Sequence, residues 1–210
     1  MKYILFSDVH CDLDACEQIV RRSKGVDFAI GAGDFGLLRK GLKQTIDALA
    51  DIQVPTILVP GNHESQSELL EACKGLHNFH VLHGEELELG GVTFFGIGCG
   101  VPETPFGPWT VDLSEDDARQ LLSRPGNPFV LITHSPPFGC LDALATQQHV
   151  GSRAIRNFVE QSRPGFVVCG HIHEDCNQQS EIAGIPVINA GPAGFEFESQ
   201  GDECVVSGHQ

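Results

Sequence analysis

Apolar, β-branched runs in this sequence repeatedly end in polar residues with oxygen or nitrogen donors, and this feature constrains the fold most. Five such endings occur, at Asp8-Val9-His10, Gly33-Asp34, Gly61-Asn62-His63-Glu64, His134 and Gly170-His171-Ile172-His173. A strand end is rigid, and open α/β sheets place ligands at the carboxyl ends of their strands. We therefore expect these residues, which are far apart in the chain, to converge on one site.

The pattern around these endings predicts alternating strands and helices. Strands are predicted over residues 3–6, 28–30, 56–59, 129–132, 166–169 and 187–189. Helices are predicted over residues 13–23, 42–52, 67–73 and 152–161, and a further helix opens at Leu113-Ser114-Glu115. Asp12 and Ser114 are the expected N-caps of two of these helices.

A middle section has a different pattern. Residues 81–82, 86–89 and 92–97 are expected to form antiparallel strands, with Gly90-Gly91 as a hairpin turn, and the proline-rich residues 102–108 form a loop. Continuous apolar strands joined by helices indicate a sheet that is buried on both faces. One mixed α/β domain spanning residues 1–210 is the economical prediction.

Composition limits the classes of partner. The formal net charge of −15 argues against long nucleic acid, which is held mainly by clustered lysine and arginine. No apolar window is long enough to span a membrane, and the apolar run at the start is too short for a signal peptide, so we expect a cytoplasmic protein. The eight cysteines form no Cys-x-x-Cys pair and are expected to be reduced thiols.

The polar endings carry the residue types of a metal site. Asp8 and His10 lie two apart, as do His171 and His173, so in extended backbone each pair faces one side. Seven donors are available, from Asp8, His10, Asp34, Asn62, His134, His171 and His173. They suffice for two ions if one carboxylate bridges them, and this mix suits Mn²⁺, Fe, Zn²⁺ or Mg²⁺.

The five endings, taken in order, resemble the signature of the calcineurin-like metallophosphoesterase superfamily. That signature is D-x-H, GD, GNH followed by D or E, a lone His, and GHxH, and it extends here from Asp8 to His173. The stretches at residues 104–109, 133–137 and 149–152 are similar to the small phosphoesterases of the Icc-related and brain-239 type. The resemblance implies an α/β fold in which a two-sheet β-sandwich is flanked by helices.

The resemblance also implies two ion sites that share Asp34, with Mn²⁺ as the first expectation for both. The first site would be formed by Asp8, His10, Asp34 and His173, and the second by Asp34, Asn62, His134 and His171. A hydroxide between the ions would be the nucleophile. His63 would contact the phosphate and protonate the leaving oxygen, and Asn62 and His149 would also bind substrate.

The predicted activity is a metal-dependent phosphodiesterase acting on a small substrate, with cyclic nucleotides, especially 2′,3′-cyclic forms, suggested by the closer resemblance. Three alternatives stay open: a phosphomonoesterase or protein phosphatase, a nuclease, and a metal-binding interaction module without turnover. Three neighbouring residues have open roles. Cys11 is not expected to coordinate metal, and Trp109 is expected to cover the core rather than stack on a base. Glu64 either orients His63 or contacts substrate, or it is a solvated or capping carboxylate.

Overall fold

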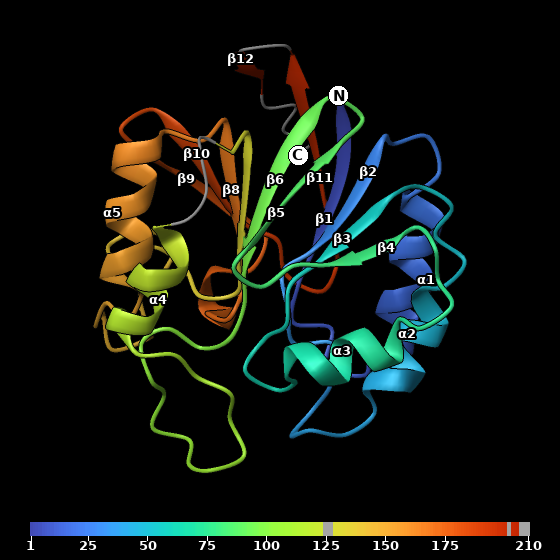
Figure 1. Ribbon diagram of the computed structural model, residues 1–210, viewed down its shortest axis with the longest axis horizontal. Coiled ribbons are helices and arrows are strands. Elements are labelled where there is room, and N and C mark those ends of the chain that lie inside the picture. The colour runs from blue at the N-terminus through green and yellow to red at the C-terminus, as the bar shows by residue number, and fades with distance from the viewer. Residues whose placement is uncertain (124–127, 201–202, 206–210) are drawn as a thin grey trace.

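Two mixed β-sheets face each other in the computed structural model, which describes residues 1–123, 128–200 and 203–205 (Figure 1). The first sheet has the strand order β12-β11-β1-β2-β3-β4. Its strands are β1 (Lys2–Phe6), β2 (Phe28–Gly31), β3 (Thr56–Leu58), β4 (Phe79–Val81), β11 (Phe195–Gln200) and β12 (Glu203–Val205). The second sheet has the order β5-β6-β7-β8-β10-β9. Its strands are β5 (Glu85–Leu89), β6 (Val92–Ile97), β7 (Val130–Thr133), β8 (Phe166–Cys169), β9 (Gln178–Ile182) and β10 (Ile185–Asn189).

The helices cover the outer faces of the sheets. Three of them pack against the first sheet: α1 (Leu13–Arg22), α2 (Leu42–Leu49) and α3 (Gln66–Ala72). Two pack against the second sheet: α4 (Glu115–Leu122) and α5 (Arg153–Ser162). The expected N-caps are confirmed, because Asp12 and Ser114 accept hydrogen bonds from the N–H groups three residues on. The predicted two-sheet sandwich flanked by helices is therefore confirmed.

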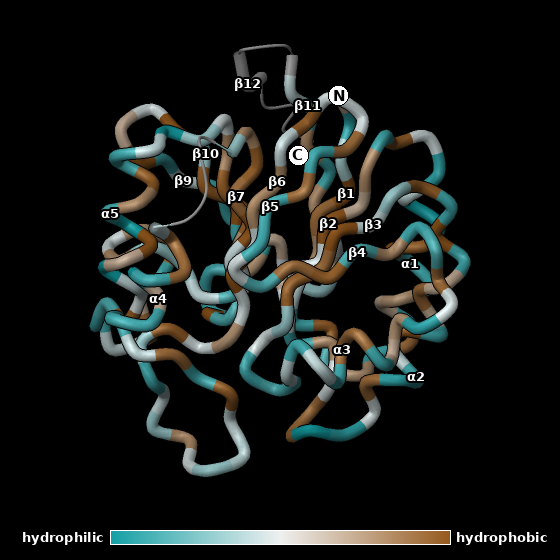
Figure 2. Tube along the Cα trace, in the orientation of Figure 1, coloured by the Kyte–Doolittle hydropathy of each residue, from teal (hydrophilic) through white to brown (hydrophobic). Residues whose placement is uncertain are grey.

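Each central strand buries both of its faces, which explains the continuous apolar runs. In β1, Tyr3 and Leu5 pack into the core between the sheets, whereas Ile4 and Phe6 pack under the helices. Successive side chains of a strand point to opposite faces, so both faces need apolar residues when both are covered. Figure 2 shows the resulting hydrophobic centre between more hydrophilic helices.

The middle section is only partly antiparallel, which corrects the prediction. The hairpin of β5 and β6 is antiparallel, and Gly90 and Gly91 turn it with positive φ angles. However, β4 pairs parallel with β3, and β6 pairs parallel with β7. In both cases a helix, α3 or α4, lies between the paired strands in the sequence and supplies the crossover that parallel pairing requires.

Strands near the C-terminal end were missed by the sequence pattern. β11 runs antiparallel to β1, with Lys2 opposite Glu198, and it contributes Phe197 to the core between the sheets.

The loop predicted over residues 102–108 contains no helix or strand. Among the described residues, no helix has both the length and the apolar character needed to cross a membrane. Seven cysteines are free thiols, and the side chain of Cys204 lies outside the described residues.

Candidate metal centre

The polar endings gather at one edge of the sandwich, as the strand pattern predicted. Asp8 follows β1, Asp34 follows β2 and Asn62 follows β3, all in the first sheet. His134 follows β7, and His171 and His173 follow β8 in the second sheet. Because the parallel strands of both sheets end on the same side, residues separated by more than 160 positions face one another.

Asp34 lies at the centre of the cluster and is almost completely buried. Its Oδ2 atom is 3.7 Å from His10 Nε2 and 3.7 Å from His63 Nε2. Its Oδ1 atom is 3.4 Å from Nε2 of His134 and accepts a hydrogen bond of 2.9 Å from the His63 backbone N–H. The two carboxylate oxygens therefore face two different sets of donors, which is the arrangement that a bridging carboxylate needs.

The donors on either side of Asp34 form two groups. In one group, the Nε2 atoms of His10 and His173 are 3.3 Å apart, and His173 Nε2 is 3.6 Å from Asp8 Oδ1. Ligand atoms of Asp8, His10 and His173 lie within 4.8 Å of one another, as do those of Asp34, His134 and His171. All but one of the predicted metal donors belong to these two groups.

Asn62, the remaining donor, joins the second group through its side-chain oxygen. Oδ1 of Asn62 is 3.1 Å from His134 Nε2, and Nδ1 of His171 is 3.2 Å from the same nitrogen. The Asn62 amide nitrogen donates to Thr110 Oγ1 at 3.0 Å, which orients Oδ1 toward the cluster. A third set of close ligand atoms comprises His10, Asp34 and His63, so His63 lies at the border of the cluster.

Backbone contacts orient the imidazole rings. Nδ1 of His10 lies 3.1 Å from the Gly36 carbonyl oxygen, and Nδ1 of His134 lies 2.8 Å from the Ala32 carbonyl oxygen. A neutral histidine that donates its Nδ1–H to a carbonyl oxygen keeps a lone pair on Nε2 with which it can bind a metal. This is the usual arrangement for a metal-binding histidine. The fold therefore presents both Nε2 atoms to the cluster.

The glycines that precede the donors allow two loops to approach closely. Gly33 has a φ of +93°, and a Cβ atom there would lie 2.6 Å from His134 Nδ1 and 2.7 Å from the Gly61 Cα. A Cβ atom at Gly61 would lie 2.0 Å from Asp34 Oδ1. Any side chain at either position would displace a predicted ligand, which gives the physical reason for glycine in the GD and GN pairs.

The side chain of Glu64 forms hydrogen bonds with both of these loops. Its buried carboxylate accepts hydrogen bonds from the backbone N–H groups of Asp34 at 2.7 Å, Phe35 at 3.3 Å and Gly61 at 2.8 Å through Oε1. Oε2 accepts from the Gly36 N–H at 3.0 Å. The sequence left the role of Glu64 open, and the structure shows a buried carboxylate that accepts backbone N–H groups rather than a solvated one.

Burial and mutual charge shift the pKa values of the cluster. Burial raises the pKa of Glu64 to about 7, assisted by the negative charge of Asp34 and opposed by the N–H groups of Gly61 and Gly36. Burial lowers the pKa of His134, but the charge and hydrogen bond of Asp34 outweigh it and raise the value to about 9. Burial, together with the charge of His134, lowers the pKa of His171 to about 4. The pKa values of the neighbouring His134 and His171 are thus shifted in opposite directions, as expected when charged groups share a buried cluster.

His63 is oriented differently from the predicted ligands. Its Nδ1 atom accepts a hydrogen bond of 2.9 Å from the Leu38 backbone N–H, so the ring hydrogen resides on Nε2, which faces Asp34. Its ring also lies 4.6 Å from that of Trp109. Trp109 belongs to none of the core clusters, so the expectation that it covers the core is wrong; it packs over His63.

A cavity of about 1330 Å³ opens at the cluster. Its lining includes His10, Asp34, Asn62, His63, His171 and His173, as well as residues 102–106 of the proline-rich loop. His149 lies on the lining with Val150, Gly151 and Arg153, so the structure brings the predicted substrate-binding histidine to the same cavity. Among the described residues, Cys11 belongs to none of the groups of close ligand atoms, and its thiol donates to the Lys40 carbonyl oxygen at 3.4 Å.

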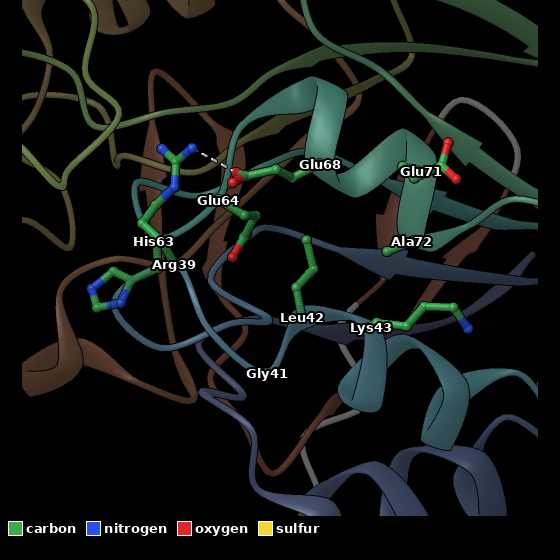
Figure 3. Close-up of a pocket in the computed structure, with 9 residues that line it drawn as sticks. All are labelled: Arg39, Gly41, Leu42, Lys43, His63, Glu64, Glu68, Glu71 and Ala72. Atoms are coloured by element: carbon green, nitrogen blue, oxygen red, sulfur yellow. Dashed lines mark ion pairs between the residues drawn. The ribbon is translucent and has the colours of Figure 1, made fainter.

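A second cavity of about 520 Å³ lies on the other side of His63 and Glu64 (Figure 3). Arg39 borders it and forms an ion pair of 2.8 Å with Glu68 of α3. Leu42 and Ala72 supply apolar lining, and Glu71 lies farther along α3 (Figure 3). This cavity has no predicted metal donor in its lining, so we assign the chemistry to the larger one.

A family model of the calcineurin-like phosphoesterase superfamily domain matches residues 1–209. The chain belongs to this superfamily. Membership, together with the donor groups described above, supports a metal-dependent phosphoesterase. The residues that sequence reasoning missed are Glu64 as the tie between two ligand loops, and Thr110 as the partner of Asn62.

Known proteins similar to this superfamily member include UPF0046 protein K07C11.7 of Caenorhabditis elegans. It is 28% identical over 197 residues, covering 77% of this chain and 67% of that protein. UPF0046 protein T07D4.2 of the same organism is 30% identical over 156 residues, covering 62% of this chain and 37% of that protein.

Solved structures share the fold at low sequence identity. TT1561 of Thermus thermophilus has a TM-score of 0.74 at 15% identity, covering 91% of this chain and 90% of that chain. A dimetal phosphatase from Danio rerio has a TM-score of 0.59 at 14% identity, covering 90% and 86% of the two chains. At these identities the likeness concerns the fold.

Proposed function

We propose that this protein hydrolyses small phosphodiesters, with cyclic nucleotides as the substrate class, using two divalent ions. Asp8, His10, Asp34 and His173 would hold one ion, and Asp34, Asn62, His134 and His171 would hold the other. The observation that carries the proposal is Asp34, whose two oxygens each face a separate group of donors. When bound, the ions would activate water and neutralise phosphoryl charge, and Mn²⁺ is the ion we expect first.

Charge counting supports a diester. Asp8 and Asp34 contribute two negative charges to a cluster that would hold two divalent ions, which leaves a net charge of +2. A hydroxide nucleophile and a diester monoanion together carry −2, so they neutralise the site. Asn62 adds an oxygen donor without adding negative charge. Phosphoryl transfer depends mainly on such positioning and neutralisation.

The cavity supports a small organic substrate. Its volume of about 1330 Å³ far exceeds that of a phosphate group, so it can enclose the group that carries the ester. Phe106 is 53% exposed and stacks on Trp109, with ring centroids 6.0 Å apart and an interplanar angle of 13°. This pair offers an aromatic surface beside His63 on which a base or an aryl group can stack.

His63 is proposed to act on the substrate from the border of the cluster. Because the Leu38 N–H occupies Nδ1, the Nε2–H of His63 is the group available to a phosphate or leaving oxygen. In this orientation His63 first serves as a hydrogen-bond donor, and full proton transfer to the leaving group requires that Nδ1 exchange its partner. His63→Asn should therefore slow diesters with poor alkoxide leaving groups more than those with p-nitrophenolate.

The test compares two substrates on Mn²⁺-loaded protein. We expect bis(p-nitrophenyl) phosphate to be hydrolysed with a higher kcat/KM than p-nitrophenyl phosphate, and the activity to be lost after chelation and restored by Mn²⁺. Dominant monoester turnover would assign the protein to the phosphomonoesterases. Absence of turnover with both substrates, at full metal occupancy, would favour the interaction module.

A further inference from the structure

One wall of the large cavity is a short hairpin that lies beside the metal centre. Ala143 and His149 form an isolated antiparallel bridge, and the Leu144 N–H donates to the Gln148 carbonyl at 3.0 Å. The Ala145 N–H is 3.4 Å from Glu174 Oε1, next to the predicted ligand His173. His149 is therefore held at the rim of the same cavity by backbone pairing rather than as a free loop residue.

A buried carboxylate fixes the ring of His149. Asp142 is completely buried, and its Oδ1 atom is 2.6 Å from Nδ1 of His149, whose side chain is 49% exposed. The Oδ2 atom accepts N–H hydrogen bonds of 2.9 Å from both Gly139 and Gly151. Because Nδ1–H donates to the carboxylate, Nε2 is the nitrogen left to meet a ligand.

Arg153 lies on the same wall and has no carboxylate partner among the described residues. Its guanidinium carbon lies 3.8 Å from the centroid of the Phe138 ring, which holds the planar group in place. In the described part of the chain Glu115 forms no ion pair with this guanidinium; its carboxylate instead accepts the backbone N–H groups of Arg153 and Ala154, both at 2.7 Å.

Other arginines of the described chain are engaged. Arg21, Arg22, Arg39, Arg119 and Arg156 each form an ion pair with a carboxylate, and Arg163 donates to a carbonyl oxygen. Among the described residues that line the large cavity, Arg153 is the one arginine or lysine. An unpaired guanidinium beside a carboxylate-backed imidazole, in a chain of net charge −15, calls for an anionic ligand.

We propose that His149 and Arg153 bind a second phosphate group, so that the substrate within the proposed class is a nucleotide that carries a further phosphate, remote from the phosphodiester that reacts at the metal centre. The inference rests on the proposed function, because it assumes that the reacting phosphodiester occupies the metal cluster. Glu103, Glu115 and Glu174 also line the cavity and disfavour an anion near them, so the attraction has to come from the side chains of His149 and Arg153. Asp142 acts here as a positioning residue, since it touches His149 and not the ligand.

The experiment measures a ratio of affinities on the Mn²⁺-loaded 210-residue chain by calorimetry. The two probes are adenosine 3′,5′-bisphosphate and adenosine 3′-monophosphate, which differ by one phosphate. We expect the bisphosphate to bind at least about tenfold more tightly, about 1.4 kcal/mol. Arg153→Gln and His149→Gln should each reduce the ratio to below about threefold, and Asp142→Asn should reduce it in the same direction.

The ratio separates recognition from damage to the fold. A variant that only loosens the hairpin would weaken both probes alike and leave the ratio unchanged. Arg119→Gln is the matched control, because Arg119 pairs with Asp116 on α4 and does not line the cavity. A wild-type ratio near one, or a ratio that survives Arg153→Gln, would overturn the proposed phosphate site.

Turnover of bis(p-nitrophenyl) phosphate by the same wild-type preparation tests the proposed function separately, because this diester has no second phosphate. Turnover without a preference for the bisphosphate would overturn the phosphate site alone. A tenfold preference without turnover would keep the phosphate site and overturn the hydrolase assignment.

Discussion

Glu64 offers the sharpest test of how the fold builds the metal centre. Its carboxylate accepts four backbone N–H groups, from Asp34, Phe35, Gly36 and Gly61, at 2.7 to 3.3 Å. It therefore links the loop after β2 to the loop after β3, and each loop carries a predicted ligand. Replacing it with glutamine keeps the shape of the side chain but exchanges one acceptor oxygen for a donor.

The magnitude follows from the hydrogen bonds. In Glu64→Gln, one amide oxygen can still accept the three N–H groups that now bind Oε1, but the amide nitrogen faces the Gly36 N–H. An unsatisfied buried donor costs about 1–3 kcal/mol, so the free energy of unfolding should fall by about that amount. Partners behind metal ligands typically contribute about 10- to 100-fold in metal affinity, so Mn²⁺ affinity should fall by a factor in that range.

Two measurements check this prediction at about pH 8, above the Glu64 pKa of about 7, so that the carboxylate is ionised. Urea unfolding in the presence of chelator gives the stability, and calorimetric titration with Mn²⁺ gives the affinity. Glu71→Gln is the control, because Glu71 is an exposed residue of α3 whose ion-pair partner among the described residues is Lys74. If Glu64→Gln unfolds at the wild-type urea midpoint and binds Mn²⁺ equally well, the role assigned to Glu64 is wrong.

Three further predictions follow from single contacts. Gly33→Ala should destabilise the protein by at least about 2 kcal/mol and abolish Mn²⁺ binding, because the new Cβ would lie 2.6 Å from His134 Nδ1 at a φ of +93°; unchanged calorimetric binding would contradict this. The folded-state pKa of His134, about 9, exceeds its ordinary value, so its contribution in metal-free protein is complete below about pH 6.5 and is lost as pH rises toward about 9. Urea midpoints that rise over this range would argue against it. Phe106→Ala should raise KM for nucleoside diesters at least about fivefold, since base stacking contributes about 1–3 kcal/mol, while metal content measured by mass spectrometry stays at the wild-type value.

Most helices and strands could be predicted from the sequence because the signals that mark them are local. Asp12 and Ser114 cap helices through N–H groups three residues away, and the Gly90-Gly91 turn joins adjacent strands. Whether two strands pair parallel or antiparallel could not be predicted in the same way. The strands predicted over residues 81–97 were all expected to be antiparallel, but the crossovers through α3 and α4 make two of the pairings parallel. The strand β11 was not predicted from the sequence, because its partner, β1, lies at the opposite end of the chain.

The sequence by itself indicated the candidate donors and the family, because the candidate ligands lie close after apolar runs and each carries its chemistry in its own side chain. Only the tertiary structure decided how these donors are held and what surrounds them. Glu64 bonds to loop residues 28 to 30 positions away, and nothing near it in the sequence indicates that contact. The same holds for the unpaired Arg153 and for Trp109 over His63. A donor's identity is a local property, whereas its partners depend on which segments the two sheets bring together.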